Sequence, residues 1–192
     1  MEKLKQCILS QVTIEKKSMD TILSVFEPLE LTKGQFFLES GKICRQMAFI
    51  ESGFMRMYDL VDGKEVTLWI GSEGRFITSL SSFVFQTSNM WNIQAITDCK
   101  LYTIHRDQHF KLNKEEPKWL EFDNILLANS FALLEKKMFS QLHTTAKERF
   151  HALLAEEPTL FQNVPLQYIA SMLGITPESL SRLRKNTIKS IT

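Results

Sequence analysis

Cysteine is scarce in this 192-residue sequence, and its three residues lie far apart. Cys7, Cys44 and Cys99 are odd in number and contain no C-x-x-C pair. This spacing gives no support to a disulfide framework, a zinc site or a four-cysteine iron–sulfur site, and we expect no cofactor. Without a disulfide framework the three thiols are expected to be reduced. Reduced thiols are usual in the cytosol, so we expect a cytoplasmic protein.

Long hydrophobic runs and an excess of charge of one sign are also missing. No run approaches the roughly 20 apolar residues of a membrane span, and the polar N-terminus is unlike a signal peptide, so we expect no membrane partner. The net charge of +1 argues against bulk polyanion binding. The basic residues are unevenly placed, however: residues 147–192 hold six against four acidic ones, and residues 1–146 hold 17 against 18. A basic C-terminal end on a neutral body is typical of a sequence-specific DNA reader.

Glycine is rare outside one segment, since six of the seven glycines fall between residues 34 and 74. Ser52-Gly53 is a turn signal and Asp62-Gly63 a hairpin signal. Short strand-like runs accompany and follow these turns, at residues 36–38, 47–50, 54–58, 66–70, 92–97 and 100–104. Many short strands at this spacing predict an antiparallel sandwich or roll over residues 1–113. Ahead of the strands, residues 18–26 predict a short helix with Ser18 as its N-cap.

From about Pro117 the apolar period becomes helical, and residues 114–142 are predicted to form one long helix. Two apolar stripes cover more than half of its circumference, so this helix cannot leave one side in water. A homodimer seam is the favoured explanation, formed by Leu120, Leu127, Phe131, Leu134 and Met138. The alternative is a central helix buried between two domains of a monomer.

Residues 143–192 are predicted to form a helical domain whose most informative part is residues 164–185. Two short amphipathic segments flank Gly174, and Ala170 lies four positions earlier, which suits two helices that cross steeply. Thr176 is a good N-cap and Pro177 a good first residue for the second segment. The pattern predicts a helix-turn-helix, and an ordinary helical hairpin is the structural alternative.

The second helix carries the candidate DNA contacts. Arg182 has the chemistry to read guanine and Glu178 to accept from a cytosine amine. Candidate base contacts are Glu178, Ser179, Ser181 and Arg182, and candidate phosphate contacts are Thr176, Arg184, Lys185 and Lys189.

The order of parts, a glycine-rich roll, an apolar helix and a two-helix motif, resembles the CRP/FNR superfamily of bacterial transcription regulators, in particular its short Bacteroidetes-type members. Residues 33–41, 48–56, 62–68 and 95–99 are similar to the cyclic-nucleotide-binding-type roll, and residues 174–182 to the recognition segment. The resemblance implies an α+β fold: an antiparallel, double-stranded jelly-roll-like β-roll, a dimerisation helix and a winged-helix-like helix-turn-helix domain. It implies a homodimer on a pseudo-palindromic operator in double-stranded DNA, with RNA polymerase as a further candidate partner. By position, the base-reading residues would be Pro177, Glu178 and Arg182, and proline cannot donate a base contact.

The resemblance also places a candidate small-molecule effector site in the roll. Its predicted residues are Arg75, Phe76, Thr78, Ser79, Leu80, Asn89, Met90 and Trp91. In cyclic-nucleotide receptors a glutamate holds the ribose and an arginine holds the cyclic phosphate, and these positions fall on Ser79 and Asn89. Without the charged partners, cyclic AMP binding is disfavoured. An apolar ligand site or a packed core could occupy the same place.

Other chemistries have little support in the sequence. His105 and His109 have i,i+4 spacing but no third ligand, so no metal site is expected. No catalytic Ser/His/Asp spacing, phosphate loop or paired carboxylates are visible, so we expect a protein that is not an enzyme. The sequence thus predicts a dimeric DNA-binding regulator that does not respond to cyclic AMP. The alternative is a small-ligand-sensing module whose helical C-terminal region contacts protein rather than DNA.

Overall fold

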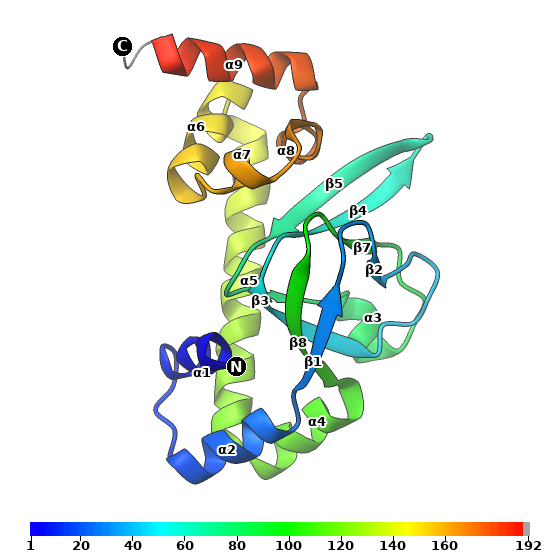
Figure 1. The fold of residues 1–192 in the computed structure, drawn as a ribbon, viewed down its shortest axis with the longest axis vertical. Coiled ribbons are helices and arrows are strands. Elements are labelled where there is room, and N and C mark those ends of the chain that lie inside the picture. The colour runs from blue at the N-terminus through cyan, green and yellow to red at the C-terminus, as the bar shows by residue number, and fades with distance from the viewer. Residues whose placement is uncertain (190–192) are drawn as a thin grey trace.

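The computed structural model describes residues 1–189, and the side chains of residues 1–187. A β-roll lies alongside one long helix, and a group of shorter helices lies at the C-terminal end of that helix (Figure 1). The roll and the helices around it comprise α1 (Glu2–Leu9), α2 (Lys16–Ser24), β1 (Glu27–Leu31), β2 (Phe36–Leu38), β3 (Gln46–Ser52), β4 (Met55–Val61), β5 (Lys64–Gly71), β6 (Phe76–Ile77), α3 (Leu80–Phe85), β7 (Asn92–Ala95), β8 (Cys99–His105) and α4 (Arg106–Glu115). The long helix is α5 (Pro117–His143), and the C-terminal helices are α6 (Ala146–Glu156), α7 (Leu160–Asn163), α8 (Leu166–Leu173) and α9 (Pro177–Lys189).

The roll consists of two four-stranded sheets in which the paired strands are antiparallel. One sheet has the order β1-β8-β3-β6 and the other β2-β7-β4-β5. Between them lies a core that includes Phe49, Met55, Ile93 and Leu101, each at most 1% exposed. The roll and the antiparallel strands predicted from the glycine spacing are confirmed.

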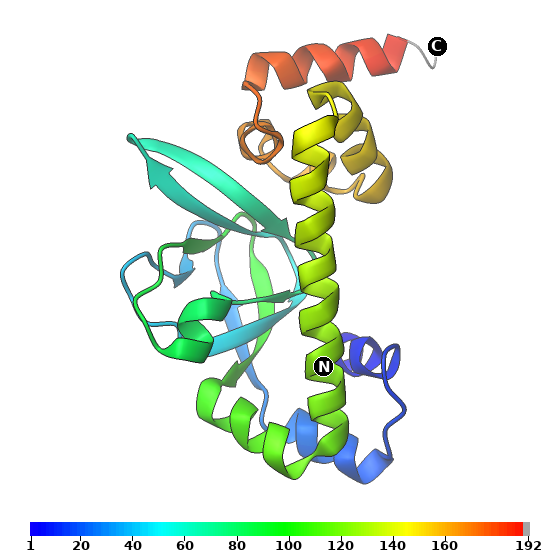
Figure 2. The ribbon, with the colours of Figure 1, turned by 180° about the vertical axis from the view of Figure 1, so that it is seen from behind.

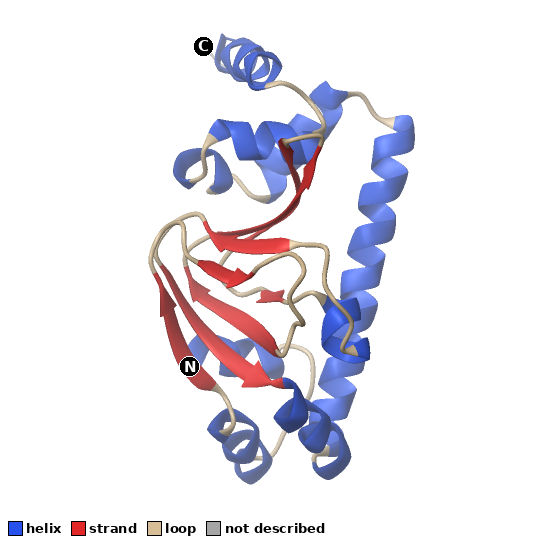
Figure 3. Cartoon of the chain, turned by 90° about the vertical axis from the view of Figure 1, so that its right-hand side faces the viewer, coloured by secondary structure: helices blue, strands red, loops and turns tan. Residues whose placement is uncertain are grey.

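The β4–β5 hairpin projects from the roll toward the C-terminal helices (Figures 1 and 3). Asp62 and Gly63 connect its strands, with φ angles of 51° and 74°. Positive φ at both turn residues is typical of a type I′ turn, which suits the twist of a two-stranded ribbon. The hairpin predicted at Asp62-Gly63 is therefore confirmed.

The N-terminal segment departs from the sequence-based expectation. Glu15 precedes the first residue of α2, so the predicted N-cap at Ser18 is wrong. Ser18 lies inside the helix and its hydroxyl donates to Glu116 Oε2 at 2.7 Å. The preceding helix α1 was not expected; it buries Leu4 and Ile8 fully, and it contacts β3.

Helix α5 runs along the molecule from the roll to the C-terminal helices (Figure 2). Pro117 occupies its first turn, as predicted. Near this end Trp119 and Phe122 are at most 1% exposed and contact Phe26 and Phe76 in aromatic pairs with centroids 5.8 Å apart. These contacts attach the first half of α5 to the roll.

The C-terminal helices share a second core that includes Phe150, Leu160, Ile169 and Leu180. Helix α6 begins with a capping box, in which the Thr145 hydroxyl accepts from the Glu148 backbone N–H and the Glu148 carboxylate accepts from the Thr145 backbone N–H. No strand follows β8 within residues 1–189, so a wing hairpin is not part of the described C-terminal region.

Candidate functional site

Helices α8 and α9 are joined by a tight turn at Gly174. Its φ of 70° lies in the left-handed region that favours glycine, and nothing would obstruct a Cβ there, so backbone conformation alone explains the residue type. The Ile175 N–H donates to the Ala170 carbonyl at 3.0 Å, which gives this carbonyl in the last turn of α8 a hydrogen-bond partner. Ala170 and Leu180 are both 0% exposed, so the small residue and the apolar residue pack in the same core.

Thr176 caps the N-terminus of α9. Its hydroxyl accepts from the Ser179 backbone N–H at 3.2 Å and lies at the same distance from the Ser179 hydroxyl. Hydrogen bonds from its own backbone N–H and from Thr176 lower the pKa of Glu178, and nearby Arg182 acts in the same direction. The first turn of α9 therefore presents a carboxylate that stays ionised near neutral pH.

The face of α9 opposite Leu180 is open to solvent. Glu178, Arg182 and Lys185 are exposed, and Ser181 is partly exposed between them. Residues three and four positions apart share one face of a helix, so positions 178, 181, 182 and 185 form one surface. Of the other candidates, Thr176 is exposed, Ser179 and Arg184 are partly exposed, and the side chain of Lys189 lies outside the described residues.

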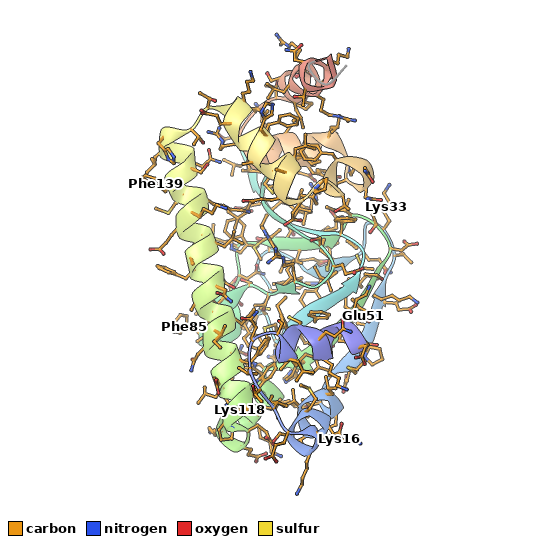
Figure 4. The ribbon with its side chains drawn as sticks, turned by 90° about the vertical axis from the view of Figure 1, so that its left-hand side faces the viewer. Lys16, Lys33, Glu51, Phe85, Lys118 and Phe139 are labelled. Carbon is orange, nitrogen blue, oxygen red and sulfur yellow. The ribbon has the colours of Figure 1, made fainter. Side chains whose placement is uncertain are left out.

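The candidate dimer stripe on α5 is uncovered in the single chain. Exposed fractions range from 38% for Leu127 to 65% for Met138, and the stripe also contains Leu120, Phe131 and Leu134. Phe139, beside the stripe, lies on the outer edge of α5 (Figure 4) and is 64% exposed. Large apolar side chains exposed in a row on one helix indicate an interaction surface.

A cavity of about 380 Å³ lies between the roll, α3, α4 and α5. It is lined by Met47, Met57, Trp69, Phe76, Ile77, Thr78, Leu80, Phe83, Val84, His109, Phe110, Asp123, Leu126, Leu127 and Ser130. No lysine or arginine is part of this lining, and Asp123 is its one carboxylate. The wall is mainly apolar, which suits a neutral small molecule better than an anion.

The structure brings only three of the predicted effector residues to this cavity: Phe76, Thr78 and Leu80. Asn89 instead holds two loop segments together, because its amide donates to the Glu39 and Lys42 carbonyls at 2.7 and 3.1 Å. Arg75 lies 3.9 Å from the Glu157 carboxylate. Ser79 is 2% exposed, Met90 is 57% exposed and Trp91 is partly exposed, and none of the three belongs to the lining.

Sequence reasoning missed the polar pair in the cavity wall. His109 Nε2 lies 3.2 Å from Asp123 Oδ2, and Asn113 Nδ2 donates to the same oxygen at 3.1 Å. The one signal in the sequence was Asp123 itself, a carboxylate inside an apolar stretch of α5. A carboxylate buried there requires a polar partner from another element. The other histidine, His105, caps α4 by accepting from the Asp107 backbone N–H. Among the described residues no group of three or more His, Cys, Asp or Glu could hold a metal ion.

Comparison with known proteins shows which folds this chain resembles. Residues 28–116 match the family model of the cyclic nucleotide-binding domain. A search of curated proteins gives no match. Among solved structures, FixK2 from Bradyrhizobium japonicum has a TM-score of 0.76 at 18% identity, over 86% of this chain and 86% of that chain. The c-di-GMP-responsive global regulator CLP from Xanthomonas campestris has a TM-score of 0.70 at 16% identity, over 92% of this chain and 93% of that chain.

A protein from Eubacterium rectale, described as a transcriptional regulator of the CRP/FNR family, has a TM-score of 0.68 at 19% identity, over 92% of this chain and 85% of that chain. The chain therefore has the fold of the CRP/FNR regulators, as the sequence resemblance predicted. Within it, residues 28–116 are the part that matches the cyclic nucleotide-binding domain model. No helix in the described part of the chain is long and apolar enough to cross a membrane.

Proposed function

We propose that this protein is a cytoplasmic, sequence-specific DNA-binding transcription regulator of the CRP/FNR type. The observation that carries the proposal is the exposed face of α9, where Glu178, Ser181, Arg182 and Lys185 stand together on a helix fixed from behind by Leu180. A polar, partly basic helix face of this length matches the major groove. Arg182 and Glu178 read base edges, with Ser179 and Ser181 beside them, while Thr176, Arg184, Lys185 and Lys189 contact phosphates.

The regulator acts as a homodimer through α5. The exposed stripe from Leu120 to Met138 gives each chain a long apolar surface, and a second copy of α5 would cover it. Two copies of α9 related by a two-fold axis read a pseudo-palindromic operator. RNA polymerase is a further partner of such a DNA-bound dimer.

The roll senses something other than cyclic AMP. The lining of the cavity beside α5 has no lysine or arginine to pair with a cyclic phosphate, and it carries the carboxylate of Asp123. A neutral, mainly apolar effector fits this lining, and the cavity shares Leu127 with the dimer stripe. Occupancy of the cavity would thereby influence the pairing of the two α5 helices.

The purified protein can be tested by selection from a random-sequence DNA duplex pool. We expect a palindromic site, bound with a steep salt dependence. Arg182→Ala should cost about 1–3 kcal/mol on the selected site and relax the preference at one position of each half-site. Lys185→Ala should weaken binding to selected and random duplexes alike and reduce the salt slope by about one per chain.

Gln162→Ala supplies the matched control, because Gln162 is exposed in α7, outside the α9 face. Failure of the protein to enrich any site would contradict DNA binding and favour a helical C-terminal region that contacts protein. An unchanged preference in Arg182→Ala would remove the base-reading role from that residue.

A further inference from the structure

The β4–β5 hairpin of the roll is bound directly to α8, the helix that carries α9. Arg56 in β4 is central to this contact, and its side chain is only 2% exposed. Its guanidinium lies between two tyrosine rings, 3.8 Å from the centroid of Tyr58 in β4 and 3.8 Å from that of Tyr168 in α8. A buried cation between two aromatic faces holds both elements at a fixed separation.

The guanidinium of Arg56 has two hydrogen-bond partners on the roll side. Nη1 donates to Glu65 Oε2 at 2.6 Å, and Nη2 donates to Gln94 Oε1 at 2.9 Å. These bonds orient the guanidinium plane, so that its free face is presented to Tyr168. The roll therefore supplies a preorganised cationic surface, and α8 supplies the ring that covers it.

A second contact joins the same two elements one helical turn away. Ser171 in α8 accepts from the Thr67 backbone N–H at 2.8 Å and donates to the Glu65 carbonyl at 3.2 Å. Strand β5 is an edge strand of its sheet, and Ser171 satisfies backbone groups on that open edge. Tyr168 and Ser171 are three residues apart and thus lie on one face of α8.

The hairpin and its neighbours also enter the core of the C-terminal helices. Ile70 of β5 and Ile96 belong to the buried cluster that contains Ile169 and Leu173. Beyond β5, the Ser72 hydroxyl donates to the Glu157 carboxylate at 3.1 Å. The roll thus fixes α8 through a stacked cation, two hydrogen bonds between the Ser171 hydroxyl and the backbone of β5, and shared apolar packing.

Because α8 and α9 pack against each other through Ala170 and Leu180, the position of α8 determines that of α9. We propose that Arg56 and Tyr168 are positioning residues for DNA recognition, which set the placement of α9 relative to α5 and so the separation of the two recognition helices in a dimer. This inference rests on the proposed function. It assigns to the hairpin contact the selectivity for operator spacing, as distinct from the base preference carried by α9.

The test uses the full-length protein and the operator recovered by selection, with one base pair inserted into or removed from the centre between the half-sites. Each such change rotates one half-site by about a tenth of a helical turn. We expect the wild-type affinity to fall about tenfold or more on the altered spacers. In Tyr168→Leu, which removes the ring but keeps an apolar side chain, the penalty should fall to less than about threefold.

Tyr168→Phe is the matched control, because it keeps the ring over Arg56, and it should retain the wild-type spacing penalty. The base preference within each half-site should be unchanged in both variants, which a general loss of structure would not leave intact. Ser171→Ala, which removes the two bonds to β5, repeats the test if thermal denaturation shows Tyr168→Leu to be unfolded.

A spacing penalty in folded Tyr168→Leu and Ser171→Ala equal to that of the wild type would overturn the inference, as would a wild type that binds all spacers equally. Both results would leave DNA binding itself intact. A wild type that binds no duplex would instead overturn the proposed function, so the two failures are distinguishable.

Discussion

His109 in α4 and Asp123 in α5 form a buried polar contact, with Nε2 of the imidazole 3.2 Å from Oδ2 of the carboxylate. The two residues are 4% and 7% exposed. His109 also packs against the rings of Phe83 and Trp119, at centroid distances of 5.3 and 5.7 Å. The contact therefore joins the end of the roll to the helix that we propose for dimerisation, in the wall of the candidate effector cavity.

Removal of the carboxylate should destabilise the protein. Asp123→Ala leaves the buried imidazole and the Asn113 amide without their shared acceptor, and we expect a loss of about 2–4 kcal/mol in the free energy of unfolding. Glu121→Ala is the control on the same helix. Its exposed ion pair with Lys118 is worth no more than about 0.5 kcal/mol. Urea denaturation measures both variants, and equal, small losses would show that the buried contact contributes little.

The exposed stripe on α5 predicts the oligomeric state. Phe131→Glu combined with Leu134→Glu places two charges on the proposed seam, and we expect the dimer to dissociate into folded monomers at micromolar concentration. Asn129→Glu adds a charge on nearly the opposite side of the helix and should leave the dimer unchanged. Sedimentation equilibrium gives the masses. A wild-type monomer, or a double variant that remains dimeric, would contradict the use of this stripe as the seam.

The parts of the fold that local chemistry determines were predictable from the sequence. Asp62-Gly63 makes a hairpin because both residues tolerate positive φ, and Pro117 suits the first turn of a helix. Thr176 caps α9 because its hydroxyl reaches the backbone N–H three residues on. In each case the residue type meets a requirement within its own turn.

The parts that depend on distant residues were not predictable. Helix α1 offers only Leu4 and Ile8 as fully buried side chains, and it gains its stability from packing on the roll. Ser18 looks like a helix cap, but its hydroxyl donates to Glu116, 98 residues away. The sequence resemblance places Asn89 at the position of a ligand-binding arginine, but its amide donates to loop carbonyls. No local pattern shows which of these long-range partners a side chain will meet.

The capping box of α6 predicts a titration. Hydrogen bonds from the Thr145 backbone N–H and then its hydroxyl lower the pKa of Glu148 from its ordinary value of 4.5. A lowered folded-state pKa means that this contribution to stability is present above about pH 4.5 and is lost as the pH falls through the lower value. Thr145→Ala should return the pKa of Glu148 toward 4.5, as followed by its side-chain carbonyl resonance. A pKa of 4.5 in the wild type would show that the box is not formed in solution.

Cyclic AMP should have no effect on this protein. The lining of the cavity beside α5 contains no lysine or arginine, and Ser79 and Asn89, which the sequence resemblance places at the nucleotide-holding positions, lie outside that lining. A buried phosphate without a cationic partner loses its strongest interaction, while Asp123 adds repulsion. Millimolar cyclic AMP should therefore shift Tm by less than about 1 °C and change operator affinity less than about twofold. Adenosine, which lacks the phosphate, is the control. It tests whether the base and ribose fit the cavity in the absence of the phosphate charge. A rise of several degrees with cyclic AMP but not with adenosine would show that the protein supplies a phosphate partner from outside this cavity.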